Sequence, residues 1–149
     1  MIYLVIPCYN EQEVLEDSTK KLASLIGRMQ GEDMRILFSD DGSRDETWNI
    51  ICKLHHQYPF VEGIRLAHNE GHQKALWAGM EAAADRAEAI ISIDADLQDD
   101  IEVIPRMVAD FRQGADVVYG VRKERDTDSA FKRLTALTFY RLMNTLGSH

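Results

Sequence analysis

The sequence has few cysteines and no long hydrophobic run. Only Cys8 and Cys52 occur among its 149 residues, which disfavours a disulfide framework and favours a reducing compartment. No apolar segment approaches the roughly 18 residues that a transmembrane helix requires. The apolar stretch at residues 2–6 stops at Pro7 and has no basic leader, so no signal peptide is expected. These absences predict a soluble chain.

The chain also lacks an excess of basic residues. Its net charge of −8 argues against general nucleic-acid binding, although residues 122–125 form a short basic segment in the acidic background. Hydrophobic residues make up 45% and charged residues 28%, as in globular proteins. A chain of this length is expected to fold as one domain with its own core.

Short apolar runs alternate with amphipathic segments along the chain. Strands are expected at residues 2–6, 35–39, 61–66, 89–93 and 117–119. Helices are expected between them, with starts capped at Asn10 and Ser43, then at residues 73–86, 104–114 and 129–146. This alternation predicts an α/β fold, a mostly parallel sheet with helices on both faces. Ligands of such sheets bind beyond the carboxyl ends of the strands.

An acidic cluster follows the strand expected at residues 89–93. Asp94 and Asp96 alternate, so in extended backbone their side chains would point the same way and share one divalent cation. Mg²⁺ or Mn²⁺ suits such hard oxygen ligands, and no Cys/His cluster lies nearby to favour zinc. The alternative is a solvated acidic turn.

Four polar segments follow strands and are expected to share one cleft: residues 7–11, 40–43, 68–72 and 94–100. Each also has a structural interpretation. Tyr9 can cover the core, and residues 40–43 can be a turn before a helix. Residues 122–125 can be a solvated loop. Cys8 is expected to be a small buried hydrophobe and not a nucleophile.

Five motifs, taken in order, resemble the family 2 glycosyltransferases. They are VIPCYNE at residues 5–11, DDGSRD at 40–45, NEGHQKAL at 69–76, DADLQD at 94–99 and VYGVR at 118–122. Within that family they are most similar to the polyprenyl-phosphate branch, which includes dolichol-phosphate mannose synthase and bacterial undecaprenyl-phosphate glucosyltransferases. The resemblance covers essentially the whole chain.

The resemblance implies the GT-A fold of nucleotide-diphospho-sugar transferases. Residues 1–121 would form the nucleotide-sugar-binding core. Residues 122–149 would be a basic loop and an amphipathic helix of the same domain, leading to an acceptor-binding and membrane segment that this chain lacks. The full-length protein would then work at the cytoplasmic side of a membrane.

The resemblance also implies roles for single residues. The donor, a UDP- or GDP-sugar, would be bound by Pro7, Tyr9, Glu11, Asp40, Asp41, Ser43, Asp94, Ala95, Asp96 and Arg122. Asp94 and Asp96 would hold Mg²⁺ or Mn²⁺, and Gln98 would lie beside the diphosphate. A polyprenyl phosphate acceptor is already anionic, so it would attack with inversion and without a catalytic base.

Other functions remain open at this point. The segment after the first expected strand lacks the Gly-rich sequence typical of a nucleotidyltransferase. A phosphoacceptor signalling domain would need paired acids after the first strand and a lysine after the fifth, and neither is found. A donor-binding but inactive module, or a glycosyltransferase of the same family with a saccharide acceptor, fits the same motifs.

Overall fold

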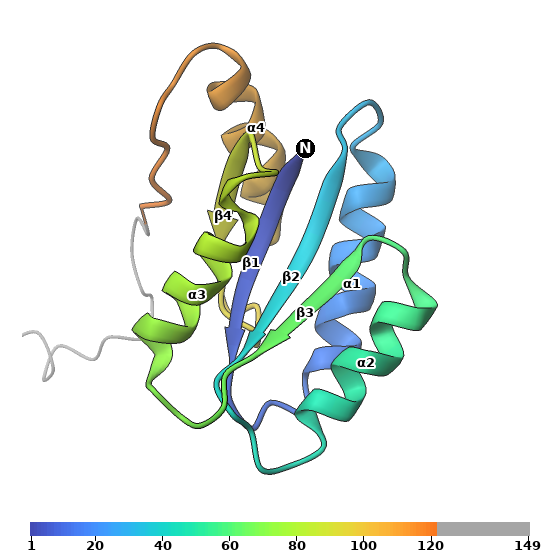
Figure 1. Ribbon diagram of the computed structural model, residues 1–149. Coiled ribbons are helices and arrows are strands. Elements are labelled where there is room, and N and C mark those ends of the chain that lie inside the picture. Colours follow the sequence, from blue (N-terminus) through green and yellow to red (C-terminus); the bar gives the residue numbers. More distant parts are fainter. Residues whose placement is uncertain (122–149) are drawn as a thin grey trace, which may run out of the picture. The chain divides into compact units, whose positions relative to one another are not determined.

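The computed structural model describes residues 1–121, so the predictions for Arg122 and for a helix at residues 129–146 lie outside the described part. Met1–Val118 form one compact unit. Its elements alternate along the chain (Figure 1). They are β1 (Ile2–Cys8), α1 (Leu15–Arg28), β2 (Met34–Asp40), α2 (Thr47–Gln57), β3 (Val61–Arg65), α3 (His72–Ala84), β4 (Ala89–Ser92), the 3-10 helix η1 (Ile101–Val103) and α4 (Ile104–Arg112).

The four strands form one parallel sheet in the order β3-β2-β1-β4. Every residue of β1 is buried, because β1 is paired on both edges and covered on both faces. This burial explains why residues 2–6 are apolar without alternation, as expected of an inner strand of a parallel sheet. Cys8 lies opposite Asp40 in the register, which brings the ends of β1 and β2 together.

Helices cover both faces of the sheet, as predicted (Figure 1). One face packs against α1, α2 and α4, in a core that includes Leu22, Ile51 and Val108. The other face packs against α3. A Cβ atom at Gly79 would lie 2.6 Å from Val5 Cγ1, so α3 approaches β1 closely at this glycine. Both faces therefore exclude water, and polar groups gather at the sheet's ends.

The fifth strand predicted at residues 117–119 is wrong, because these residues have no regular structure. Val117 is exposed, and no strand within residues 1–121 pairs with the outer edge of β4. Three apolar residues give a strand signal, but a strand also needs a partner that supplies its hydrogen bonds. In the described part of the chain β4 is thus an edge strand of the sheet.

The two predicted helix caps are also wrong. α1 begins after Val14 and α2 begins after Glu46, and neither of these N-cap residues makes a side-chain cap hydrogen bond. Asn10 and Ser43 instead connect the loops after β1 and β2. The backbone N–H of Asn10 donates to Ser43 Oγ at 2.9 Å. Short polar side chains serve helix caps and loops by the same local hydrogen bonds, so sequence alone does not separate the two uses.

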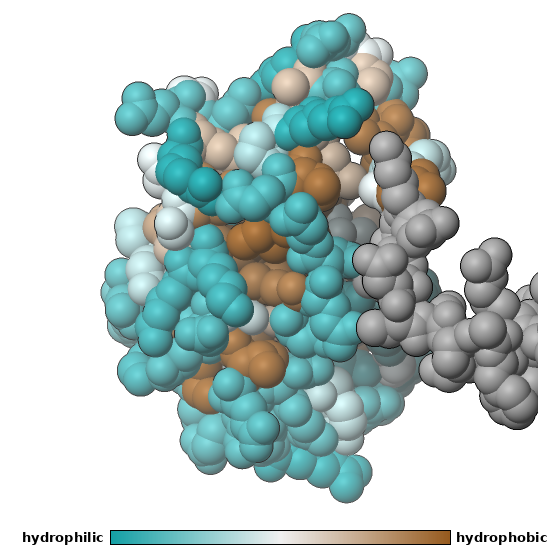
Figure 2. All heavy atoms as spheres, turned by 180° about the vertical axis from the view of Figure 1, so that it is seen from behind, coloured by the Kyte–Doolittle hydropathy of each residue, from teal (hydrophilic) through white to brown (hydrophobic). Residues whose placement is uncertain are grey.

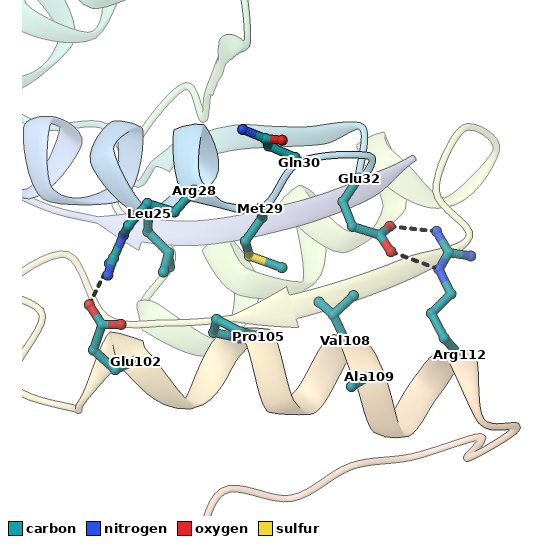
Figure 3. A pocket seen from close by; sticks show the side chains of 10 residues that line it. All are labelled: Leu25, Arg28, Met29, Gln30, Glu32, Glu102, Pro105, Val108, Ala109 and Arg112. Atoms are coloured by element: carbon teal, nitrogen blue, oxygen red, sulfur yellow. Dashed lines mark hydrogen bonds and ion pairs between the residues drawn. The ribbon is translucent and has the colours of Figure 1, made fainter.

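No helix within residues 1–121 is long and apolar enough to cross a membrane. On the face turned away from the viewer of Figure 1, hydrophobic side chains form a band between hydrophilic ones (Figure 2). A groove of about 460 Å³ lies between α1 and α4, where Arg28 pairs with Glu102 and Arg112 pairs with Glu32 (Figure 3). None of the predicted site residues lines it.

Candidate active site at the strand ends

The loops that follow β1, β2, β3 and β4 meet at the end of the sheet formed by the carboxyl ends of its strands. Asn10 bonds to Ser43, which joins the first loop to the second. Asp41 accepts hydrogen bonds from the loop after β3, and His72 Nε2 lies 3.9 Å from Asp94 Oδ1 in the loop after β4. Parallel strands produce this arrangement directly, because all their carboxyl ends point the same way.

Asp94 and Asp96 lie in a tight turn after β4. The extended backbone expected here is wrong, because Leu97 N–H donates to the Asp94 carbonyl at 3.2 Å and Leu97 has a φ of 50°. Ala95 is buried, and its carbonyl accepts a hydrogen bond from Ser18 Oγ at 2.6 Å. The turn is thereby anchored at Ala95, while both aspartates remain exposed.

Glu11 adds a third carboxylate to this part of the site. Its partial burial, together with the negative charges of Asp96, Asp45 and Asp94, raises the pKa of Glu11 above its ordinary value. Like charges raise a carboxyl pKa only when they lie near it, so the loops after β1 and β4 face each other. The site is therefore strongly anionic and suits a cation.

The residues present fit a divalent cation only in part. Within residues 1–121, no three His, Cys, Asp or Glu side chains are arranged to hold a metal ion by themselves. Mg²⁺ is commonly bound through one or two carboxylates together with substrate phosphates and water. Two exposed aspartates thus fit a metal that arrives with a phosphate ligand better than a permanent protein-only metal site.

Gln98 is hydrogen-bonded to Asp96. Its side-chain amide Nε2 donates to Asp96 Oδ2 at 2.8 Å, and its backbone N–H donates to Oδ1 at 3.2 Å. Both contacts hold the Asp96 carboxylate in one orientation. The predicted place of Gln98 beside a diphosphate stays a prediction.

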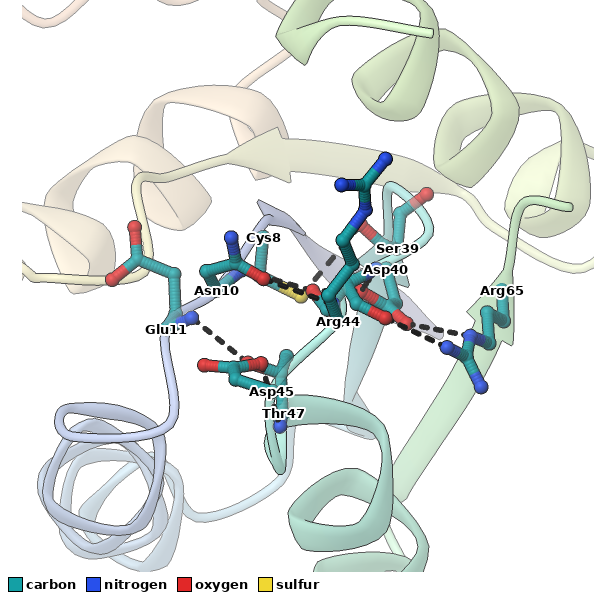
Figure 4. Close-up of polar contacts among 10 residues, drawn as sticks. Cys8, Asn10, Glu11, Ser39, Asp40, Arg44, Asp45, Thr47 and Arg65 are labelled. Carbon is teal, nitrogen blue, oxygen red and sulfur yellow. Dashed lines mark hydrogen bonds and ion pairs between the residues drawn. The ribbon is translucent and has the colours of Figure 1, made fainter. Parts of the chain in front are cut away.

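Asp40 is completely buried at the end of β2. Its Oδ1 accepts from the backbone N–H of Ser43 at 3.0 Å and from the Ser43 hydroxyl, and its Oδ2 lies 3.1 Å from Arg65 Nε (Figure 4). That ion pair does not have the geometry of a hydrogen bond, so Oδ2 keeps unused acceptor capacity. Asp40 consequently joins the ends of β2 and β3, and ligand contact at this carboxylate requires its surroundings to move.

Asp41 holds the loop after β3. Its Oδ1 and Oδ2 accept from the backbone N–H groups of Glu70 and Gly71 at 2.7 and 2.8 Å. At Gly42, whose φ is 68°, a Cβ atom would lie 2.7 Å from the backbone of His68. The loop after β3 thus packs directly on the end of β2, which places the start of α3 beside Asp94.

The remaining predicted residues differ in accessibility. The side chain of Tyr9 is 38% exposed just beyond β1, so its ring is available to a ligand. Pro7 lies inside β1 and Ser43 is buried, so both act through the backbone and loop structure that they support. Burial, with Asp40 and Glu11 nearby, raises the pKa of the Cys8 thiol far above its usual range, which agrees with its predicted role as a buried hydrophobe.

Sequence reasoning missed the residues that hold the loops together. Arg65 pairs with Asp40 and also donates to the Ser43 carbonyl at 2.7 Å. Thr47 and Asp45 accept from backbone N–H groups of the first loop. The position of Arg65 at the end of the third predicted strand was an available signal, since that strand ends at the same edge of the sheet.

Comparison with known proteins finds similar sequences and a similar fold. Residues 3–149 match the sequence model of Glycosyl transferase family 2. The uncharacterized glycosyltransferase YkoT of Bacillus subtilis is 47% identical, over 99% of this chain and 45% of that protein. The prophage bactoprenol glucosyl transferase homolog of Escherichia coli is 39% identical, and the bactoprenol glucosyl transferase of Shigella phage SfX is 38% identical, each over 99% of this chain and 47% of that protein.

The fold is shared with a solved structure. S. aureus TarS 1-349 superposes with a TM-score of 0.59 at 19% identity, over 83% of this chain and 40% of that chain. At this identity the likeness concerns the fold, which is GT-A. The chain spans about half the length of the curated relatives that it matches. The sequence model and the relatives together establish that the chain belongs to glycosyl transferase family 2.

Proposed function

We propose that this chain binds the sugar donor of a metal-dependent, inverting glycosyltransferase that moves a hexose from a UDP- or GDP-sugar to a polyprenyl phosphate. The observation that carries the proposal is the exposed pair Asp94 and Asp96, held on an anchored turn opposite Glu11 and at the same sheet edge as Tyr9. The similarity to bactoprenol glucosyl transferases supports the lipid-phosphate acceptor.

Asp94 and Asp96 would hold Mg²⁺ or Mn²⁺ against the donor diphosphate. Such a metal, when bound, would supply Lewis-acid chemistry that offsets the charge developing on the departing diphosphate. Gln98 keeps the Asp96 carboxylate in a fixed orientation for this task. The exposure of both aspartates on an anchored turn supports the assignment, since a metal that arrives with the donor can reach them.

The nucleotide would lie over the loops after β1 and β2. The exposed ring of Tyr9 offers a face on which a base can stack, and Asp41 supports the loop that closes the site from the side of α3. Arg122 is proposed to meet the phosphate oxygens, a role for which a guanidinium is well suited.

The reaction needs no protein base in this proposal. An oxygen of the acceptor phosphate forms the new bond to the sugar C1 while the bond from C1 to the diphosphate oxygen breaks, and the nucleoside diphosphate departs with the electron pair. The acceptor phosphate is already ionised near neutral pH, so no proton has to be removed. We further propose that the whole protein works at a membrane surface, where such a lipid acceptor resides.

A second candidate is a donor-binding module that does not turn over by itself. It is favoured by one fact, that the chain spans 45–47% of the length of the relatives cited above. Both candidates predict the same donor binding, and only the first predicts transfer to polyprenyl phosphate. Transfer of radiolabelled hexose to undecaprenyl phosphate in detergent distinguishes them.

The test of donor binding is calorimetric titration of the chain with UDP-glucose, UDP-N-acetylglucosamine and GDP-mannose, each with and without Mn²⁺. The proposal predicts that one of these donors binds and that chelation of the metal abolishes binding. Asp94→Asn should weaken this binding because it removes a proposed metal ligand. Asp85→Asn, at the end of α3, is its matched control because it removes a carboxylate distant from the strand ends. Absence of binding to every donor in the presence of Mn²⁺ would refute the proposal.

A further inference from the structure

The loops after β1 and β2 exchange hydrogen bonds across more than thirty residues of sequence. We call this set, formed by residues 10–12 and 43–47, the loop latch, and Figure 4 shows the part of it at Asn10, Glu11, Arg44, Asp45 and Thr47. Its five bonds run from Asn10 N to Ser43 Oγ (2.9 Å), Glu11 N to Thr47 Oγ1 (2.8 Å), Gln12 N to Asp45 Oδ2 (3.3 Å), Arg44 N to Asn10 Oδ1 (3.0 Å) and Glu46 N to Gln12 Oε1 (3.0 Å).

The bonds of the loop latch are reciprocal. Three consecutive backbone N–H groups of the first loop donate to side chains of the second, and two backbone N–H groups of the second donate to side chains of the first. Backbone N–H groups of loops that find no protein acceptor bind water instead. Here they are satisfied by the protein, so each loop fixes the path of the other.

The loop latch also fixes how Tyr9 and Glu11 are presented. Asn10, between them, has a φ of 55°, in the left-handed region that asparagine tolerates better than most residues. This turn of the backbone separates the exposed Tyr9 from Glu11, whose backbone N–H donates to Thr47 Oγ1. Loss of the loop latch would free both side chains at once.

Thr47 is the most deeply buried residue of the loop latch. It is 0% exposed at the first position of α2, and its hydroxyl oxygen accepts from Glu11 N. A residue with no accessible surface cannot touch a nucleotide sugar. Any effect of Thr47 on donor binding must therefore act through the residues that it contacts, among them Glu11 in the first loop.

We propose that the loop latch preforms the donor site before the ligand arrives, and that Thr47 is a positioning residue that acts through Glu11 and Tyr9. The inference rests on the proposed function for its ligand. Its physical basis is preorganisation: side chains already held in the bound arrangement lose less conformational freedom on binding, and affinity rises accordingly. The loop latch forms entirely from protein groups, so it needs no ligand for its assembly.

The test compares three variants in donor titrations with Mn²⁺. Thr47→Val keeps the shape of the side chain but removes the acceptor, and we expect it to weaken donor binding on the order of tenfold, as the loss of one buried hydrogen bond implies. Thr47→Ser keeps the hydroxyl and should stay within about threefold of the wild type. Thr19→Val is the control, because Thr19 is equally buried and donates to the Leu15 carbonyl within α1.

Thr19→Val should lower thermal stability and leave donor affinity of the folded chain unchanged. If Thr47→Val binds the donor like the wild type, or if Thr19→Val weakens binding as much, Thr47 has no positioning role. Rescue by Thr47→Ser separates the hydroxyl's acceptor function from a general loss of packing.

Amide hydrogen exchange, measured by NMR without any nucleotide, tests the loop latch independently. We expect slow exchange at the amides of Glu11 and Arg44 in the wild type, and faster exchange at Glu11 in Thr47→Val. Fast exchange of these amides in the wild type overturns the inference. If the wild type shows slow exchange but binds no sugar nucleotide, the proposed function and the positioning role fail while the preformed loop latch stands.

Discussion

Gln98 Nε2 lies 2.8 Å from Asp96 Oδ2, and the backbone N–H of the same glutamine reaches Asp96 Oδ1 at 3.2 Å. Both oxygens of one proposed metal ligand are thus held by a single neighbour two residues away. Groups that orient a metal ligand usually matter nearly as much as the ligand itself. We therefore propose that Gln98 orients Asp96 for metal binding without itself contacting the donor.

The first prediction concerns Gln98→Ala. Without the amide donor, the Asp96 side chain loses one of its two fixed contacts, and Mn²⁺-dependent donor affinity should fall on the order of tenfold. Titration of the donor at a series of Mn²⁺ concentrations measures this as a higher metal requirement. Gln113→Ala, at the end of α4, is the control and should change neither quantity. An unchanged metal requirement in Gln98→Ala would show that Asp96 needs no such support.

The second prediction compares two helix glycines. Gly79→Ala places a methyl group 2.6 Å from Val5 Cγ1 and 3.2 Å from Ser39 Cβ, so it should lower the free energy of unfolding by about 1–3 kcal/mol. Gly27→Ala in α1 meets nothing within 4 Å and should raise the free energy of unfolding by about 0.5–1 kcal/mol, because alanine favours helices. Urea denaturation measures both, and equal effects at the two positions would contradict the close packing of α3 on β1.

The third prediction concerns acid stability. Contacts with the Met1 ammonium and with Arg112 lower the pKa of Glu88 to about 2, well below the value of about 4.3 of an unfolded chain. A carboxyl whose pKa is lowered by folding stabilises the protein above the unfolded pKa and loses this contribution as the pH falls toward the folded pKa. The urea concentration at the unfolding midpoint should therefore decrease as the pH is lowered from about 5 to about 2.

Glu88→Gln should reduce the slope of this acid transition, because the amide cannot titrate. Glu81→Gln, at an exposed position of α3, is the matched control and should keep the wild-type slope. An identical pH profile for the wild type and Glu88→Gln would mean that the contacts with Met1 and Arg112 do not persist in solution.

Much of the fold could be predicted from the sequence because its inner strands are continuous apolar runs. β1 and β2 are covered on both faces, so their sequences carry little alternation, and the four paired strands were all predicted within a few residues. Residues 117–119 have the same apolar character without a partner among residues 1–121. Pairing is a property of the tertiary structure, so local sequence could not exclude a strand there.

The site was predictable at the level of loops and less so at the level of contacts. Parallel strands bring their following loops together, which placed Tyr9, Asp41 and Asp94 at one edge from sequence alone. The turn at Asp94 depends on Ser18 of α1, which donates to the Ala95 carbonyl across 77 positions of sequence. The hydrogen bonds of the loop latch likewise join loops that are distant in sequence, so no local sequence pattern predicts them.

The central claim is that Asp94 and Asp96 hold a divalent cation together with the donor diphosphate. Electron paramagnetic resonance of free Mn²⁺ tests it directly, since bound Mn²⁺ loses the sharp signal of the aqueous ion. We predict that the signal of free Mn²⁺ falls further when the chain and a binding sugar nucleotide are present together than when the nucleotide is present alone. The double variant Asp94→Asn/Asp96→Asn should remove this extra fall. An extra fall of equal size in the double variant, or none in the wild type, would contradict the account.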